Sequence, residues 1–158
     1  GPTAPAGQSE TGAEMPVRGV ATSGWRGRSF SLGIADSVTV LAATAAEADA
    51  AATVIANAVD VSDQGIRRLP ASACKDDSDL GDIPVTTEVE PLAPAQVRRA
   101  LDAGAVRAGR LQRMGLVWSV VLVCQGQWAM VEPLSLHASG GSAIAGQPRA
   151  AAVGSVFA

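Results

Sequence analysis

Aromatic side chains are scarce in this sequence, at 3% of 158 residues with no tyrosine at all. Hydrophobic residues nevertheless make up 47% of the chain. The core must therefore be built from Ala, Val, Leu and Ile, and alanine buries little area per residue. A chain of this length and apolar content is predicted to form one folded domain.

Positive charge is also in short supply. The chain has 12 basic and 15 acidic residues, for a net charge of −3, and Lys75 is its only lysine. This balance excludes an obvious electrostatic surface for nucleic acid. The arginines reflect either a compositional bias or, at individual positions, recognition of anions by the guanidinium group.

Cysteine and histidine are too few for the metal and redox motifs that they usually form. Cys74 and Cys124 make neither a CxxC motif nor a disulfide framework. Cys124 lies in an apolar strand and is expected to be a small buried hydrophobe, whereas Cys74 lies in a polar loop. The single histidine, His137, lies in a Gly/Ser-rich tail, where we expect it to be exposed and inactive.

Long hydrophobic runs are missing as well. No apolar run reaches the ~18 residues of a membrane span, and no signal peptide is evident, so the sequence predicts a cytoplasmic protein that does not enter the membrane. The chain begins Gly1-Pro2 without methionine, and residues 1–16 have the composition of a flexible arm or linker. We therefore expect a processed or truncated chain.

Two helices are predicted. Thr44 followed by Glu47 matches the capping-box pattern, which favours a helix over Ala45–Val59. Pro94 suits the first turn of a second helix over Pro94–Met114, with a break at Gly104 as one alternative. The predicted strands are Val17–Thr22, Ser29–Leu32, Ser37–Ala43, Val85–Val89, Leu116–Cys124 and Gln127–Val131, and a short strand or turn is expected over Gly65–Leu69.

These elements predict an α+β domain, in which a mostly antiparallel sheet packs against the two helices. The domain occupies residues 17–132, followed by a Gly/Ser/Ala-rich tail over 133–158. The run Leu116–Cys124 is apolar throughout, which is typical of a strand covered on both faces. Two helices are too little cover for both faces, so we expect another chain or a second copy of this one to complete the fold.

Three polar residues stand four apart on the first predicted helix: Asp49, Thr53 and Asn57. A step of four residues places them on one face, one turn apart. Their carboxylate, hydroxyl and amide oxygens are hard ligands that suit Mg²⁺ or Ca²⁺. The structural alternative is that Asp49 favours the helix dipole while Thr53 and Asn57 cap backbone groups.

Two loops have compositions that suggest binding. The segment Ser23–Gly33 contains three glycines interleaved with Ser and Arg, which indicates either a phosphate-binding loop or a β-hairpin. Its spacing matches neither the P-loop nor the Rossmann fingerprint. The segment Ala71–Asp82 carries four aspartates, and we interpret it as a solvated loop or as a supplier of ligands to a neighbouring divalent metal.

A family resemblance follows from several of these segments together. The strand Val38-Thr39-Val40 and the helical run Ala48–Thr53 resemble the signature of the ApbE-related superfamily. The segments Ala21–Gly24, Gly27–Gly33, Ser78–Gly81 and Gly115-Leu116 are similar to an uncharacterised branch of it. The resemblance covers about Val20 to about Val131.

This resemblance implies a site. In the flavin transferases of the superfamily, the residues matching Asp49 and Thr53 hold a divalent metal that engages the pyrophosphate of FAD, and FMN is moved onto a hydroxyl of a target protein. The implied cofactors are Mg²⁺ and FAD or FMN, and no catalytic residue is assigned. The residues expected to contact the cofactor are Ser23, Gly24, Arg28, Ser29 and Ser31.

The chain departs from the superfamily in two ways. The uncharacterised branch usually has a histidine where this chain has Arg28, and arginine binds anions but is no base at neutral pH. The N-terminal half of that branch is also missing. The resemblance therefore implies that this chain is the C-terminal half or a subunit of an enzyme that binds an anionic or phosphorylated ligand. The working enzyme is then expected to be a heterodimer with a partner chain or a homo-oligomer of this chain. A hydrolase or lyase for a small anionic metabolite, and a non-catalytic subunit, are the alternatives.

Overall fold

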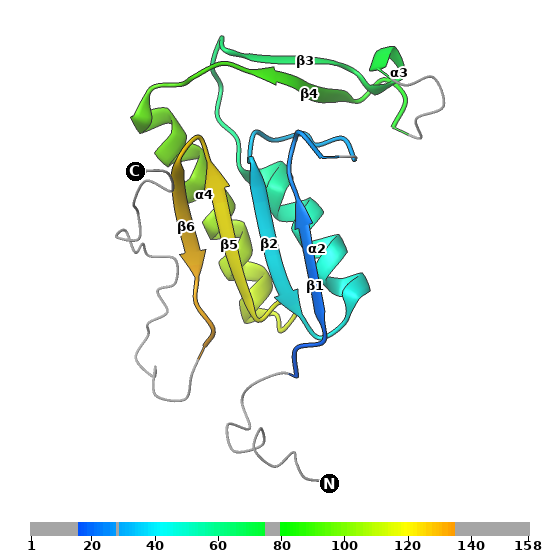
Figure 1. Cartoon of the computed structure of the whole chain (residues 1–158), viewed down its shortest axis with the longest axis vertical. Coiled ribbons are helices and arrows are strands. Elements are labelled where there is room, and N and C mark those ends of the chain that lie inside the picture. The colour runs from blue at the N-terminus through cyan, green and yellow to red at the C-terminus, as the bar shows by residue number, and fades with distance from the viewer. Residues whose placement is uncertain (1–15, 28, 75–79, 135–158) are drawn as a thin grey trace, which may run out of the picture.

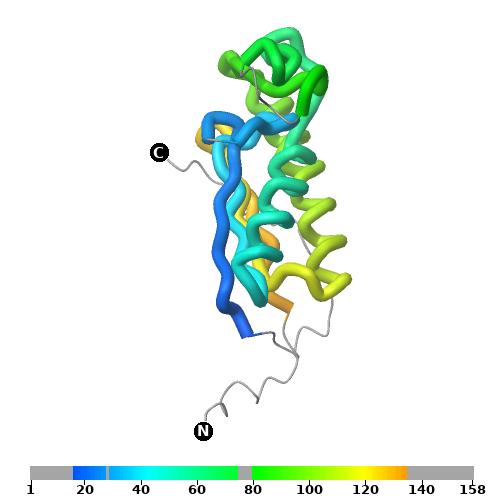
Figure 2. Tube along the Cα trace, turned by 90° about the vertical axis from the view of Figure 1, so that its right-hand side faces the viewer, coloured from blue at the N-terminus to red at the C-terminus, as the bar shows by residue number. Residues whose placement is uncertain are grey.

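The computed structural model describes residues 16–27, 29–74 and 80–134. Its main body is a four-stranded antiparallel sheet in the order β1-β2-β5-β6, formed by Gly19–Ser23, Ser37–Ala42, Ser119–Cys124 and Gln127–Val131. Helices α2 (Ala45–Ala58) and α4 (Pro94–Arg113) cover one face of this sheet. Figure 2 shows the two layers edge-on, with the sheet on one side and the helices on the other. The predicted α+β class is confirmed.

Helix α2 begins where the sequence predicts. Thr44 is the N-cap, and its side-chain oxygen accepts a hydrogen bond of 3.1 Å from the Glu47 N–H. Five buried residues, four of them alanines, face the sheet from this helix. Alanine lets the backbones approach so closely that a Cβ on Gly19 of β1 would lie 2.1 Å from the Thr44 carbonyl carbon. The small residues thus place α2 directly beneath the edge strand β1.

Helix α4 runs without interruption from Pro94 to Arg113, so the considered break at Gly104 does not occur. Gly104 is buried where α4 crosses the core, and a Cβ there would lie 2.3 Å from Val59 Cγ2 and 2.8 Å from Leu122 Cδ2. The glycine therefore permits close packing between α4, the end of α2 and the sheet.

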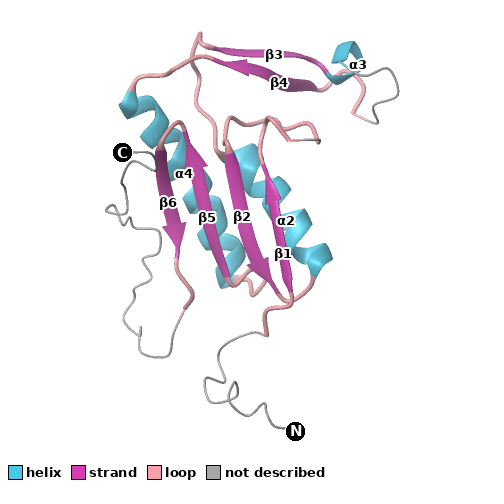
Figure 3. Cartoon of the chain, viewed as in Figure 1, coloured by secondary structure: helices cyan, strands magenta, loops and turns pink. Residues whose placement is uncertain are grey.

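The sequence predicts one sheet, and that prediction is wrong in one respect. Strand β4 (Pro84–Val89) does not join the main sheet, but pairs with β3 (Ile66–Pro70) in a separate two-stranded ribbon. This ribbon lies beyond the end of the main sheet (Figure 3). A one-turn helix, α3 (Ala71–Cys74), follows β3. Side-chain alternation identifies a strand, but it carries no information on which strand becomes its neighbour.

Two predicted boundaries are also corrected. Residues 29–32 form a loop rather than a strand. The Ser31 hydroxyl and the Leu32 N–H bond to Asn57 at the end of α2, and a single backbone bond, from the Thr86 N–H to the Ser31 carbonyl at 2.9 Å, joins the loop to β4. Strand β5 begins at Ser119, three residues after the predicted start at Leu116. Most of the predicted N-terminal arm, the tail from residue 135, and residues 75–79 of the acidic loop lie outside the described residues.

The second face of the main sheet has no covering layer within the described part of the chain. Core residues Val40, Val120 and Leu122 point toward the helices, whereas Val121 points away from them and is 36% exposed. Among the residues that the structure describes, β5 is therefore covered by helices on one face only. Within the described residues, no helix combines the length and apolarity that a membrane span requires.

Gly33 offers a test of the contact between the loop and α2. A Cβ at this position would lie 2.1 Å from the Ala56 carbonyl oxygen and 2.7 Å from that of Val59, and backbone atoms cannot move aside. We expect Gly33→Ala to lower the free energy of unfolding by about 2 kcal/mol or more. Urea denaturation measures it. Gly109→Ala is the matched control, since its nearest neighbour is the flexible Arg113 side chain at 3.5 Å and helix propensity favours the change. Equal effects at both positions would contradict the proposed contact.

Cys124 predicts a pH dependence of stability. The thiol is fully buried, and burial, followed by the nearby negative charge of Asp36, raises the pKa of Cys124 to about 12. Below pH ~9 the thiol is protonated in both states. Between pH ~9 and ~12 the Cys124 thiol ionises only in the unfolded chain. The free energy of unfolding therefore falls as the pH rises, by at most about 4 kcal/mol from this group.

Denaturant titrations at stepped pH measure this loss. The background is favourable because the chain has no tyrosine, and Lys75 is its only lysine. Cys124→Ala removes the titrating group, so we expect a shallower fall of stability over the same pH range. An unchanged slope in that variant would assign the pH dependence to other groups.

Candidate functional site

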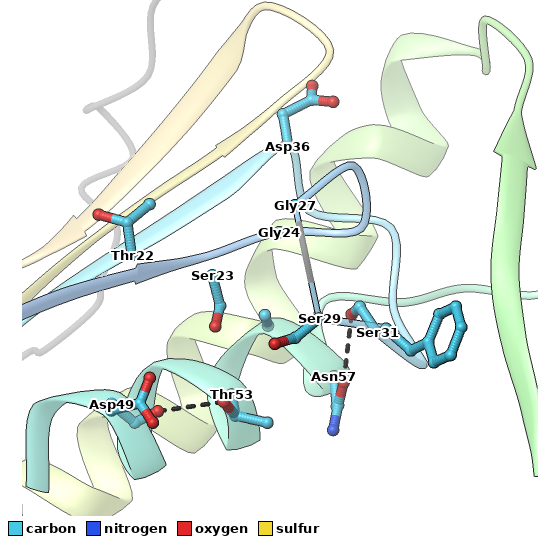
Figure 4. A pocket seen from close by; sticks show the side chains of 12 residues that line it. Thr22, Ser23, Gly24, Gly27, Ser29, Ser31, Asp36, Asp49, Thr53 and Asn57 are labelled. Carbon is cyan, nitrogen blue, oxygen red and sulfur yellow. Dashed lines mark hydrogen bonds between the residues drawn. The ribbon is translucent and has the colours of Figure 1, made fainter. Parts of the chain in front are cut away.

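A pocket lies at the edge of the main sheet, between the end of β1, the loop that follows it, and α2. Its volume is about 330 Å³. Figure 4 shows that its walls come from segments far apart in sequence, with the loop on one side and the polar face of α2 on the other. The lining residues are Thr22, Ser23, Gly24, Gly27, Ser29, Phe30, Ser31, Asp36, Asp49, Thr53, Ala56 and Asn57.

The polar face of α2 lines the pocket as the four-residue spacing predicts. Asp49, Thr53 and Asn57 all face it, from successive turns of the helix. The opposite, alanine-rich face of α2 is buried against the sheet. Packing of the small residues therefore fixes the direction in which the three polar side chains point.

Asn57 holds the loop against the helix. Its side-chain oxygen accepts hydrogen bonds from the Ser31 hydroxyl at 3.1 Å and from the Leu32 N–H at 2.9 Å. The Ser31 oxygen in turn accepts a bond of 3.1 Å from the Gly33 N–H. Thr86 of β4 fixes the same loop by donating its hydroxyl to the Gly33 carbonyl at 2.7 Å. Asn57 thus shapes the pocket wall, and its oxygen is already engaged.

Asp49 and Thr53 remain open to a ligand. Both residues are exposed. The Thr53 hydroxyl donates to the Asp49 carbonyl at 3.1 Å, as the structural alternative for this helix expects, but the hydroxyl oxygen keeps its capacity to accept. Among the described residues the Asp49 carboxylate has no hydrogen-bond or ion-pair partner. An acidic group without a partner is thus directed at the pocket.

The charge of the pocket is negative over its described lining. Asp36 and Asp49 are its charged residues, and no lysine or arginine joins them in that lining. Asp36 accepts a bond of 2.7 Å from the Gln125 N–H, and its side chain points away from the α2 face (Figure 4). The negative potential facing the cavity therefore comes mainly from Asp49.

The loop contributes hydroxyl groups rather than a cradle of free amides. The N–H groups of Trp25, Gly27 and Leu32 are all used within the protein, with the Ala35 carbonyl, the Gly24 carbonyl and Asn57 as acceptors. The Ser23 and Ser29 side chains make no hydrogen bond within the described ranges. A phosphate group in this pocket would meet the hydroxyl groups of Ser23 and Ser29, whereas these three N–H groups are already engaged.

The structure brings together six of the seven residues that the sequence assigns to the site. Ser23, Gly24, Ser29, Ser31, Asp49 and Thr53 line the one pocket. Arg28 lies outside the described residues. Thr22, Phe30 and Asp36 also line the pocket, and sequence reasoning did not find them. Whether these residues lie close to α2 depends on the path of the loop between β1 and β2, and no sequence pattern predicts that path.

The donor set suits a hard divalent cation bound in part by its ligand. Asp49 and Thr53 supply a carboxylate and a hydroxyl oxygen, and Mg²⁺ commonly uses one or two carboxylates together with waters and substrate phosphates. Over the described part of the chain no three His, Cys, Asp or Glu residues gather into a metal-binding group. The described residues therefore fit a site in which protein groups and the bound ligand both coordinate the metal, and not a site formed by protein groups alone.

Comparison with known proteins gives one match. A family model described as AbpE bacteria matches residues 2–130. No curated protein and no solved structure matches the chain. The match includes every pocket residue and both main helices. Since it spans well over half of the sequence, the chain belongs to the family described as AbpE bacteria.

Proposed function

We propose that the pocket binds a phosphorylated, anionic ligand through a divalent cation held by Asp49 and Thr53. The Asp49 carboxylate, which has no hydrogen-bond or ion-pair partner among the described residues, carries this proposal. A carboxylate facing a polar cavity repels an anion, unless a cation lies between them. The resemblance to ApbE-related proteins supports the same assignment and suggests a flavin nucleotide as the ligand. Mg²⁺ supplies charge neutralisation of a pyrophosphate when it is bound.

The remaining groups in the pocket suit a sugar-phosphate ligand. Ser23 lines the pocket from the end of β1 and Ser29 from the loop, and neither hydroxyl makes a hydrogen bond within the described residues. Hydroxyls donate to phosphate oxygens and exchange bonds with ribityl or ribose groups. Phe30 adds an apolar surface to the lining. The superfamily activity, transfer of FMN from FAD to a protein hydroxyl, is the reaction that we propose to test first.

Partner dependence belongs to the same proposal. The described lining offers one free carboxylate and several hydroxyls, but no basic side chain and no histidine. A group that moves protons in a transfer or hydrolysis step must then come from elsewhere. We propose that the working enzyme includes a second chain next to the pocket.

Asp49 is the first residue to test. We expect Asp49→Asn to weaken Mn²⁺ or Mg²⁺ binding at least tenfold, because the amide keeps the shape and removes the charge. Isothermal titration calorimetry with each metal, in the presence of FAD, measures this. Glu47→Gln is the matched control, since Glu47 lies exposed on the same helix and outside the pocket lining.

The two variants separate the possible outcomes. Equal metal affinity in Asp49→Asn and in the wild type would contradict the proposed site. Equal losses in Asp49→Asn and Glu47→Gln would indicate general electrostatic attraction to α2. A chain that folds normally and binds neither metal nor FAD, alone or with its partner, would favour the alternative of a non-catalytic subunit.

Because the described lining of the pocket is negative, we expect the phosphorylated ligand to need a divalent cation for binding. We expect FAD, or ADP as a simpler pyrophosphate probe, to bind with Mg²⁺ and to lose at least tenfold in affinity with EDTA. Fluorescence quenching of FAD or calorimetry with ADP measures this. Binding that is unchanged by EDTA would mean that residues other than Asp49 and Thr53 hold the phosphates.

A further inference from the structure

The uncovered face of the main sheet is unusual in composition. By the alternation of the strands and their register, the outward positions are Val20, Thr22, Ser37, Thr39, Leu41, Ser119, Val121, Val123, Trp128 and Met130, of which Ser119 is buried. We call these ten positions the open face. They form rows across the sheet, such as Thr22–Thr39–Val121–Met130. None of the ten residues carries a charge.

Such a face does not match a surface that stays in water. An antiparallel sheet with one solvated face normally alternates apolar residues with polar and charged ones on the outside. Here Val20 is 59% exposed and Val121 36% exposed, while Trp128 and Met130 are partly exposed beside them. The composition is that of a surface that packs against another layer.

Two opposite charges stand at the corners of the open face. Arg18 precedes β1 and continues its ladder through a bond of 3.2 Å from its N–H to the Ala42 carbonyl. Glu132 follows β6, the other edge strand. Both lie at the same end of the sheet, where β1 begins and β6 ends, and alternation directs both side chains outward. Both are exposed, and neither forms an ion pair within the described ranges.

We propose that the open face binds the same face of a second copy of this chain. The two-fold axis runs parallel to the strands, between β2 and β5. This rotation exchanges the edges and keeps the ends, so β1 of one copy faces β6 of the other. Arg18 of each copy then faces Glu132 of the other, and the uncharged centre packs without like-charge repulsion. Sheets that pack face to face with aligned strands are a common arrangement.

The dimensions of the face set the strength of the association. Four strands about 4.8 Å apart, each five to six residues long, give a face of roughly 19 by 18 Å. The roughly 340 Å² of this face is less than half of the roughly 800 Å² that each partner buries in a standard interface, as in weak, transient complexes. The dimer is therefore weak, with a Kd of about 1 to 100 µM, and reversible.

The dimer also reaches the pocket. Thr22 lies on the open face and lines the pocket, so the two surfaces are continuous. In the proposed arrangement β6 of the second copy lies over the end of β1 and forms part of the pocket rim. This consequence rests on the proposed function of the pocket, whereas the dimer itself does not.

Sedimentation equilibrium of the full chain, from about 1 to 300 µM, tests the proposal. We expect the average mass to rise from the monomer toward twice that value. Val121→Lys places a charge at the centre of the face, near its own symmetry mate, and we expect at least a tenfold weaker dimer. Val106→Lys is the matched control, because Val106 is 62% exposed on α4 and outside the open face. Circular dichroism confirms that both variants fold.

Reversal of the corner charges tests the geometry. Arg18→Glu and Glu132→Arg each replace two attractions by two repulsions, and we expect each to weaken the dimer about tenfold. The double variant Arg18→Glu/Glu132→Arg restores the attractions and the wild-type affinity. A chain that stays monomeric at all concentrations would overturn the proposal, and so would a dimer that is insensitive to Val121→Lys. The proposal would also fail if the chain alone stays monomeric and a different polypeptide binds the wild type but not the Val121→Lys variant. Measuring metal and FAD binding by the monomeric Val121→Lys variant tests the pocket separately from the dimer.

Discussion

The contact between the loop over residues 29–36 and the C-terminal end of α2 holds this structure together. The Asn57 side chain accepts bonds from Ser31 and Leu32, and the Ile34 N–H donates to the Val59 carbonyl at 2.8 Å. Gly33 permits this approach, since a side chain there would overlap with the Ala56 carbonyl. The contact closes one wall of the pocket, and it leads directly into β2. Fold and candidate site therefore depend on the same few bonds.

Small residues explain how a chain with so few aromatic residues forms a defined cavity. The buried alanines of α2 bring the helix close to β1 and β2, and Gly104 does the same for α4. Close layers leave little space in the core, so the polar face of α2 is turned outward beside the edge strand. The cavity lies where the loop after β1 spans the gap between that strand and the helix. The positions of Asp49 and of the Ser23 and Ser29 hydroxyls in the cavity lining follow from this arrangement.

The candidate site and the open face are two consequences of one layer architecture. In the described part of the chain, helices cover one side of the sheet and no layer covers the other, and the edge strand β1 belongs to both regions. Within the described residues the cavity lacks a basic side chain and the open face lacks a charged one. Both features support the proposal that the chain works next to another polypeptide, which the apolar run Leu116–Cys124 led us to expect.

The sequence by itself determined the local elements. The Thr44 cap, the proline at the start of α4 and the alternation in β4 are local signals, because they depend on backbone bonds and side-chain periods within one segment. The four-residue spacing likewise determined that Asp49 and Thr53 share a face. Only the tertiary structure decided that β4 leaves the main sheet and that residues 29–32 bond to α2 instead of forming a strand. It also decided that Thr22, Phe30 and Asp36 reach the same pocket. These outcomes depend on contacts between distant segments, whose energies no local pattern records.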